Sequence, residues 1–275
     1  MSDPMSDSNL ELALDQLVGI SRRAGAAILD WYDGDMGITQ KADNTPLTKA
    51  DLASHDLIST ELTRLWPEIP VLSEESADIP WVTRQSWQRY WLVDPLDGTR
   101  EFINHNDEFT VNIALIKDHQ PVLGIVYVPV TGICYFGAGD YGAWRQKNED
   151  PATAIEVRQP AAEPAVIVGS RSHANPELAS QLNKLGPHEL ISMGSSLKFC
   201  RVAEGLADFY PRIGPTSEWD TAAAQAVVEA AGGQVVKIDG TPLGYNTREA
   251  YLNPYFFVFG DPAREWLWPF QDSSH

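Results

Sequence analysis

Two aspartates separated by a proline and a leucine form the most informative pattern in the sequence. The segment YWLVDPLDGTREF starts as an apolar run typical of a strand and leads directly into Asp94 and Asp97. Because Pro95 fixes one backbone dihedral and Gly98 permits a tight turn, both carboxylates and the Leu96 carbonyl can converge. Hard cations such as Mg²⁺ prefer such oxygen ligands. In isolation, an Asx turn that ends a strand explains the motif equally well.

Other acidic residues follow other predicted elements. Glu74 and Glu75 end the run IPVLSEE, and Asp220 lies near the start of a predicted helix in TSEWDTAAAQAVVEAAGG. A solvated loop accounts for the glutamates alone, and capping by Thr216 or Ser217 accounts for an acid in the first helical turn. Neither accounts for carboxylates at the ends of three separate elements. That repetition favours a shared metal site.

The overall charge restricts the partners. The 275 residues include 38 acidic and 20 basic side chains, which give a net charge of -18 and a pI near 4.6. Binding to nucleic acid polymers depends on clustered lysine and arginine, so it is disfavoured here. A small anionic substrate needs a local positive charge, which a bound cation supplies. The free amides of Gly98 and Thr99, which start a predicted helix, also favour a phosphate.

The cysteines and the N-terminal residues indicate the cellular compartment. Cys134 and Cys200 lie far apart, without the paired spacing of a disulfide framework or a zinc site. The N-terminal segment MSDPMSDSNL is acidic and polar, and no apolar run is long enough to span a membrane. We therefore expect a cytoplasmic protein without an export signal or an integral membrane segment.

Helical and strand patterns are mixed along the whole chain. Apolar residues at helical spacing predict helices over about 10–32, 52–65, 176–185, 196–205 and 219–231. Runs rich in β-branched residues predict strands at 69–72, 90–93, 110–117, 122–128, 165–169, 234–238 and 256–260. We expect a layered, mixed α/β fold with a boundary in the polar stretch 146–163. Residues 1–150 would hold the main metal site, and residues 151–275 would complete the site and the substrate pocket.

At these residues the sequence resembles the inositol monophosphatase superfamily, whose members are lithium-sensitive, Mg²⁺-dependent phosphatases. The signature D-P-[ILV]-D-G-[ST] matches Asp94–Thr99, and the signature W-D-x-A-[AG] matches Trp219–Ala223, both without a gap. The resemblance covers about residues 10–259. It implies a layered α-β-α-β-α sandwich of the inositol monophosphatase and fructose-1,6-bisphosphatase type.

Within the superfamily, the chain is most similar to bacterial 3′(2′),5′-bisphosphate nucleotidases of sulfate assimilation. The likeness lies in KADNTPLTKAD, IPVLSEE, YWLVDPLDGTREFI, FTVNIALI, GSSLKFC and YLNP. It implies hydrolysis of the 3′-phosphate of adenosine 3′,5′-bisphosphate (PAP) to AMP and phosphate, with the sulfated precursor PAPS as a further candidate substrate. The alternatives are an inositol or sugar monophosphatase of the same superfamily and a non-catalytic, acidic cation-binding protein.

The resemblance also implies which residues bind the metal and activate water. Asp51 and Thr99 would hold and activate the attacking water, and Thr48, one helical turn before Asp51, would support it. Two or three Mg²⁺ ions are implied. Their ligands would be Glu74, Asp94, the Leu96 carbonyl, Asp97 and Asp220.

Substrate contacts follow from the same resemblance. Arg212 lies where inositol phosphatases carry an acid that binds sugar hydroxyls, and a cation there favours a second phosphate. Ordinary surface or loop positions explain the basic side chains equally well. The residues implied on the phosphate side are Glu74, Leu96, Asp97, Gly98, Thr99 and Asp220. Those implied to contact the nucleotide are His173, Ser195, Lys198 and Arg212.

The sequence allows more than one oligomeric state and bears on a possible association with the membrane. Monomer and homodimer are both compatible with the sequence. The resemblance adds peripheral association with the cytoplasmic face of the inner membrane, which the acidic composition does not support.

Overall fold

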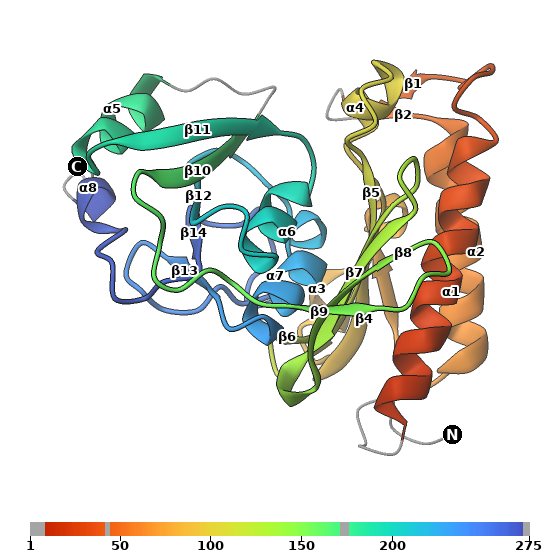
Figure 1. Cartoon of the computed structure of the whole chain (residues 1–275). Coiled ribbons are helices and arrows are strands. Elements are labelled where there is room, and N and C mark those ends of the chain that lie inside the picture. Colours follow the sequence, from red (N-terminus) through yellow and green to blue (C-terminus); the bar gives the residue numbers. More distant parts are fainter. Residues whose placement is uncertain (1–8, 42–44, 171–175, 272–275) are drawn as a thin grey trace.

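The elements stack in five layers. The computed structural model describes residues 9–41, 45–170 and 176–271. Helices form the two outer layers and the middle layer, and a sheet lies on each side of the middle helices (Figure 1). In order, the helices are α1 (Leu10–Leu29) and α2 (Lys49–Leu65), α6 (Leu197–Ala203) and α7 (Ala222–Ala230), and α5 (Pro176–Lys184) and α8 (Trp268–Gln271). This arrangement confirms the expected α-β-α-β-α sandwich.

The larger sheet has seven strands in sequential order. β3 and β4 pair in parallel, and each later neighbouring pair is antiparallel. The strands are β3 (Val71–Ser73), β4 (Arg89–Asp97), β5 (Thr110–Lys117), β6 (Gln120–Val128), β7 (Ile133–Ala138), β8 (Gly142–Lys147) and β9 (Thr153–Ile155). A separate ladder of β1 (Thr39–Gln40) and β2 (Pro46–Leu47) precedes α2.

The smaller sheet has the order β11-β10-β12-β14-β13. β10 pairs in parallel with β11 and β12, whereas β14 is antiparallel to β12 and β13. Its strands are β10 (Ala165–Ser170), β11 (His188–Met193), β12 (Phe209–Arg212), β13 (Gln234–Lys237) and β14 (Phe256–Phe259). The remaining short helical segments are η1 (Glu74–Ser76), α3 (Trp81–Arg84), α4 (Thr99–Ile103), η2 (Gly139–Tyr141) and η3 (Glu218–Asp220).

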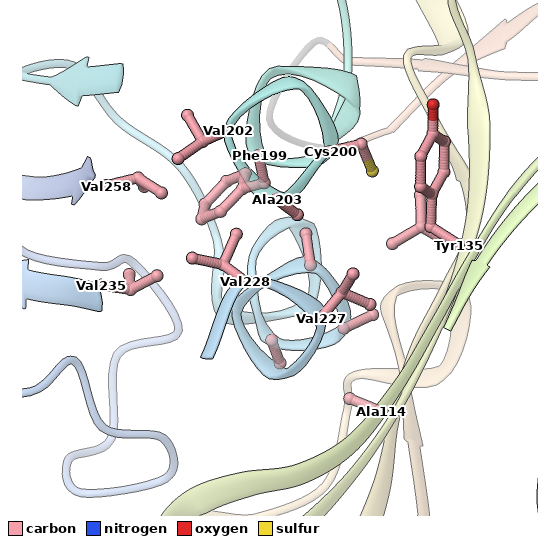
Figure 2. Packing of buried hydrophobic residues seen from close by; sticks show 14 of the residues in the cluster. Ala114, Tyr135, Phe199, Cys200, Val202, Ala203, Val227, Val228, Val235 and Val258 are labelled. Carbon is pink, nitrogen blue, oxygen red and sulfur yellow. The ribbon is translucent and has the colours of Figure 1, made fainter. Parts of the chain in front are cut away.

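Buried apolar side chains join the layers. One cluster lies between α1, α2 and the larger sheet, and another lies between the smaller sheet and helices α5 and α8. Figure 2 shows the middle cluster, in which Phe199 of α6 and Val227 of α7 lie between Ala114 of the larger sheet and Val258 of the smaller one. The two sheets are therefore held together by apolar burial around the central helices. No helix in the described ranges is both long and apolar enough to cross a membrane.

Helix α7 approaches the larger sheet closely because glycines face it. A Cβ atom added at Gly124 of β6 would lie 2.0 Å from the Ala223 carbonyl oxygen, and one added at Gly137 of β7 would lie 2.9 Å from the Ala230 Cβ. Both distances are well below ordinary van der Waals contact, and a packed interior has little room to adjust. The two glycines thus set the distance between α7 and this sheet.

The last long helix begins later than the sequence predicts. The expected helix over 219–231 is replaced by the short turn η3 followed by α7, which starts at Ala222. The Ser217 backbone N–H donates to the Asp220 carboxylate at 2.9 Å, in a capping box that shapes a separate turn before the α-helix. Asp220 consequently lies in this turn and not inside the α-helix.

The sequence also misses strands β7, β8, β9, β11 and β12. β8 and β9 pair with each other, so the larger sheet continues to Ile155 and past the expected boundary at residue 150. β8 carries several polar residues and β9 is short and largely exposed, so neither has a long apolar pattern. β7 is apolar and buried, so its sequence ICYFGA did contain a usable strand signal. The division into residues 1–150 and 151–275 stays a prediction.

Candidate active site

A pocket of about 300 Å³ brings together segments from both sheets and from η3. Asp51 is buried beside the pocket and is not part of its lining, and His173 lies outside the described residues. The predicted site residues that line the pocket are Glu74, Asp94, Leu96, Asp97, Gly98, Thr99, Ser195, Lys198, Arg212 and Asp220.

Three of the aspartates form a compact cluster. One carboxylate oxygen from each of Asp94, Asp97 and Asp220 lies within 4.8 Å of the other two. Burial raises the pKa of Asp94 well above its usual value, and the surrounding carboxylates raise it further. Burial and neighbouring carboxylates raise the pKa of Asp220 in the same way. Like charges this close need a proton or a cation between them.

The donor set of this cluster fits a divalent cation. Within the described ranges, no lysine or arginine nitrogen forms an ion pair with any of the three aspartates. Carboxylate oxygens that converge on one point are the ligands that Mg²⁺ selects, because it is a small, hard cation. The three aspartates can therefore hold a divalent metal ion.

Strand β4 delivers two of these aspartates to the pocket. Its pairing with β5 shifts register between Asp94 and Asp97, and Asp94 Oδ1 accepts the Leu96 backbone N–H at 3.0 Å in an Asx turn. Gly98 follows with a φ of +93°, a conformation that favours glycine. A Cβ atom there would also lie only 3.2 Å from the Glu108 carbonyl oxygen. The Asx turn thus belongs to the aspartate cluster and is not an alternative to it.

Asp97 is oriented by several donors. Its Oδ2 accepts the Ser195 hydroxyl and the Ser196 backbone N–H, both at 2.7 Å, and the Asn112 side-chain amide at 3.4 Å. Burial raises the pKa of Asp97, and Lys198 opposes this shift. Ser195, which the family resemblance implies as a nucleotide contact, therefore donates a hydrogen bond to an aspartate of the cluster.

A buried hydrogen-bond network of Glu218, Asn246 and Arg84 holds the turn that carries Asp220. The neighbouring Glu218 is 1% exposed, and its two carboxylate oxygens accept the Asn246 backbone N–H at 3.0 and 2.9 Å. The Asn246 side chain accepts a hydrogen bond from buried Arg84 of α3 at 2.6 Å. These contacts fix η3, which carries Asp220, to a distant part of the chain.

Glu74 lies in the pocket but is paired with a lysine. Lys41 Nζ lies 2.6 Å from Glu74 Oε1 and 2.7 Å from Glu75 Oε1. Burial alone lowers the pKa of Lys41, but the two carboxylates outweigh it and raise this pKa overall. Glu74 is accordingly close to the aspartate cluster without being one of its three members.

Asp51 connects to the pocket through Thr99. The Thr48 backbone N–H and hydroxyl donate to Asp51 Oδ2 at 2.7 and 2.5 Å, in the capping box that starts α2. The Thr99 hydroxyl donates to Asp51 Oδ1 at 3.2 Å. Burial raises the pKa of Asp51, and the Thr48 hydrogen bonds oppose the shift. The three residues thus form a chain that ends at the pocket surface.

Both cations that were predicted as substrate contacts line the same pocket. Lys198 of α6 is only 6% exposed, and it lies 5.5 Å from the centre of the Tyr210 ring. Burial lowers the pKa of Lys198 to about 8, with Arg212 adding to the effect and Asp97 opposing it. The Arg212 guanidinium donates to the Pro215 carbonyl at 2.7 Å. Lys198 is therefore not an ordinary surface cation.

Several residues of the site were not predicted from the sequence. Asn112 gave a usable signal, because it is a single amide within the apolar run FTVNIALI and is buried in the structure. Lys41 reaches Glu74 across 33 residues, and such a contact leaves no local pattern. Arg100 and Ser196 also line the pocket and were not predicted.

Comparison with known proteins identifies the family. The inositol monophosphatase family profile matches residues 9–257. The chain is 54% identical to 3′(2′),5′-bisphosphate nucleotidase CysQ of Escherichia coli O6:H1 over 248 residues, and this alignment covers 89% of this chain and 98% of that protein. It is 36% identical to CysQ of Haemophilus influenzae over 262 residues, and this alignment covers 95% of this chain and 97% of that protein.

Solved structures of relatives have the same fold. The crystal structure of CysQ from Bacteroides thetaiotaomicron, a bacterial member of the inositol monophosphatase family, gives a TM-score of 0.77 at 39% identity, with 90% of this chain and 97% of that chain covered. Inositol monophosphatase from Anabaena gives 0.76 at 26% identity, with 96% and 97% covered. This chain belongs to the inositol monophosphatase family.

Proposed function

We propose that this chain is a Mg²⁺-dependent 3′(2′),5′-bisphosphate nucleotidase. The observation that carries the proposal is one pocket that holds three clustered aspartates together with Lys198 and Arg212, in a chain 54% identical to a nucleotidase of that name. The acids suit a metal, and the cations suit a substrate with a second phosphate. The assigned reaction is hydrolysis of the 3′-phosphate of PAP to AMP and phosphate, with PAPS as a second candidate substrate.

The acidic residues hold the metal under this proposal. Bound Mg²⁺ neutralises charge on the phosphoryl oxygens and lowers the pKa of water. Asp97 keeps its orientation through the Ser195 and Ser196 donors, and Asp220 keeps its position through the Ser217 cap. The residues assigned to two or three ions are Glu74, Asp94, the Leu96 carbonyl, Asp97 and Asp220.

Thr99 and Asp51 act on the attacking water. The Thr99 hydroxyl donates to Asp51, so its oxygen can accept a hydrogen bond from a water molecule in the pocket. The proton lost by this water passes toward the Asp51 carboxylate, whose raised pKa makes it a better base. The water oxygen forms a bond to phosphorus, the bond to the 3′ oxygen breaks, and this oxygen takes a proton from solvent.

Lys198 and Arg212 bind the rest of the substrate. Both line the pocket together with the aspartates, and charge-assisted contacts to a phosphate are strong and directional. Gly98 and Thr99 line the side of the transferred phosphate. Residues 1–150 supply Asp94 and the water-activating pair, whereas residues 151–275 supply Asp220 and the cations. The two proposed halves would thus both be needed for turnover.

A phosphate-release assay on purified protein with Mg²⁺ tests this function. The substrates are PAP, PAPS and inositol 1-phosphate at equal concentrations. We expect PAP to have a kcat/KM at least about tenfold above that of inositol 1-phosphate, since the second phosphate is an additional contact. Equal or better turnover of inositol 1-phosphate contradicts the substrate assignment. Metal binding without phosphate release from any substrate indicates a non-catalytic cation-binding protein.

Lithium adds a second check on the same assay. Family members are lithium-sensitive, and we expect millimolar lithium to inhibit phosphate release here. The Mg²⁺ concentration should be varied in parallel, because a cation that replaces Mg²⁺ inhibits less when Mg²⁺ is abundant. Undiminished activity at these lithium concentrations would weaken the subfamily assignment while leaving the fold unaffected.

A further inference from the structure

A protein cation already contacts one of the proposed metal ligands. Lys41 Nζ lies 2.6 Å from Glu74 Oε1 and 2.7 Å from Glu75 Oε1. The pair is sheltered, because the side chains of Lys41, Glu74 and Glu75 are 20%, 24% and 4% exposed. The lysine is anchored locally, since its backbone N–H donates to the Thr45 carbonyl at 2.9 Å. The ammonium group therefore has a defined position at the edge of the pocket.

A metal ion and the Lys41 ammonium group would compete for the negative charge of the Glu74 carboxylate. An ion bound through Glu74 Oε1 would lie within a few ångströms of the Lys41 ammonium, where like charges in a sheltered site repel strongly. An unpaired Glu74 beside three aspartates would in turn face strong repulsion from acids alone. Some cation is thus favoured at Glu74 whether or not a metal is bound.

We propose that Lys41 is a built-in counter-cation that neutralises Glu74 in the metal-free protein and gives way when a divalent ion binds there. The proposal rests on the metal site assigned under the proposed function. Glu75 makes the exchange practicable, because it also lies 2.7 Å from Lys41 and can keep this contact when the contact with Glu74 is broken. Lys41 then loses its contact with Glu74 but keeps its contact with Glu75, so its ammonium group is not left unpaired.

Competition of this kind lowers the apparent affinity for the metal. An ion must displace an ammonium group whose interaction with a partly exposed carboxylate is modest. Removal of the competitor should therefore tighten Mg²⁺ binding by roughly five- to tenfold. A lysine that merely supports the fold would give the opposite result, because its loss would loosen the segment around Glu74.

The first experiment is calorimetric titration of Mg²⁺ into metal-stripped protein, without substrate. We compare wild type, Lys41→Met and the matched control Lys49→Met, whose ammonium pairs with exposed Asp35 at 2.9 Å. The expected result is tighter binding for Lys41→Met and an unchanged affinity for Lys49→Met. Unchanged or weaker binding in Lys41→Met overturns the proposal. So does equal tightening in both variants, because that outcome reports only a loss of positive charge.

The second experiment uses the wild-type protein and stays valid if the variant fails to fold. Lysines are acetylated briefly with and without saturating Mg²⁺, and the modified sites are mapped by mass spectrometry. We expect labelling of Lys41 to increase severalfold with Mg²⁺ while labelling of Lys49 stays constant. Unchanged protection of Lys41 in the metal-loaded protein overturns the proposal. Neither experiment depends on PAP, so failure of the substrate assignment would leave both results interpretable.

Discussion

The acidic and the cationic parts of the pocket are built differently. Asp94 and Asp97 belong to a central strand, and their side chains accept hydrogen bonds from fixed backbone and hydroxyl donors. Lys198 and Arg212 instead contact carbonyls of the connecting segments near Ser195 and Pro215. Under the proposed function, the acids that act on the reacting phosphate are oriented by donors, whereas the cations that select the substrate are held by carbonyls of the connecting segments. Changes in the acidic part should affect every substrate, and changes in the cationic part only some.

The largest effect should come from the aspartate cluster. Asp97→Asn or Asp220→Asn removes a charged metal ligand at nearly constant volume, and we expect turnover of every substrate to fall at least about 1000-fold. Exposed Asp56 of α2 gives the matched control Asp56→Asn, which should keep wild-type activity. Circular dichroism checks that each variant is folded. Activity of Asp97→Asn within tenfold of wild type would refute the proposed role of this cluster.

The next largest effect should distinguish Thr99, which is proposed to contact the attacking water, from Thr48, which only orients Asp51. Thr99→Val removes the hydroxyl at the pocket and should lower kcat by about 100- to 1000-fold with little change in KM. Thr48→Val removes one of the two donors that Thr48 gives to Asp51 and leaves the backbone N–H in place, so we expect a loss of only about tenfold. Steady-state kinetics on PAP measures both. Equal losses in the two variants would indicate a purely structural role for Thr99.

Local and long-range features of the site differ in how far the sequence could predict them. Asp94, Asp97 and Gly98 follow one another in the chain, so their local geometry could be derived from turn chemistry. The capping box of Thr48 and Asp51 is local in the same way. The pair of Lys41 and Glu74 depends on how distant segments pack, which no local pattern encodes. The late start of α7 shows a similar limit, because a cap at Ser217 competes with continuous helix.

A smaller effect should distinguish the cationic part of the pocket. Arg212→Gln should raise the KM for PAP by about tenfold, because one charge-assisted contact to the second phosphate is lost. The kcat/KM for inositol 1-phosphate should change less than about twofold, since this substrate has no second phosphate. Arg64→Gln, on the exposed side of α2, controls for loss of positive charge. Equal loss for both substrates would remove Arg212 from substrate selection.

The smallest effect concerns stability without metal. Asp94→Asn keeps an acceptor for the Leu96 backbone N–H and removes one of three closely spaced carboxylates. Because burial and repulsion raise the pKa of Asp94, its charged form destabilises the metal-free fold. In EDTA at pH 8 we expect the variant to melt about 2–4 °C above wild type. With Mg²⁺ the order should reverse, and a variant less stable in EDTA would contradict the repulsion argument.

Helix α7 meets the larger sheet at Gly124 and Gly137, and neither glycine lines the pocket. This contact nevertheless sets how far Asp220, just before α7, lies from the aspartates of β4. A random-mutagenesis screen for inactive variants should thus recover Gly124→Ala as well as replacements of the proposed ligands. The Gly124 variant would retain every one of these ligands. Added metal would partly restore such a variant, because its ligands are displaced and not lost. Distance from the pocket is therefore a poor guide to which residues this enzyme can tolerate losing.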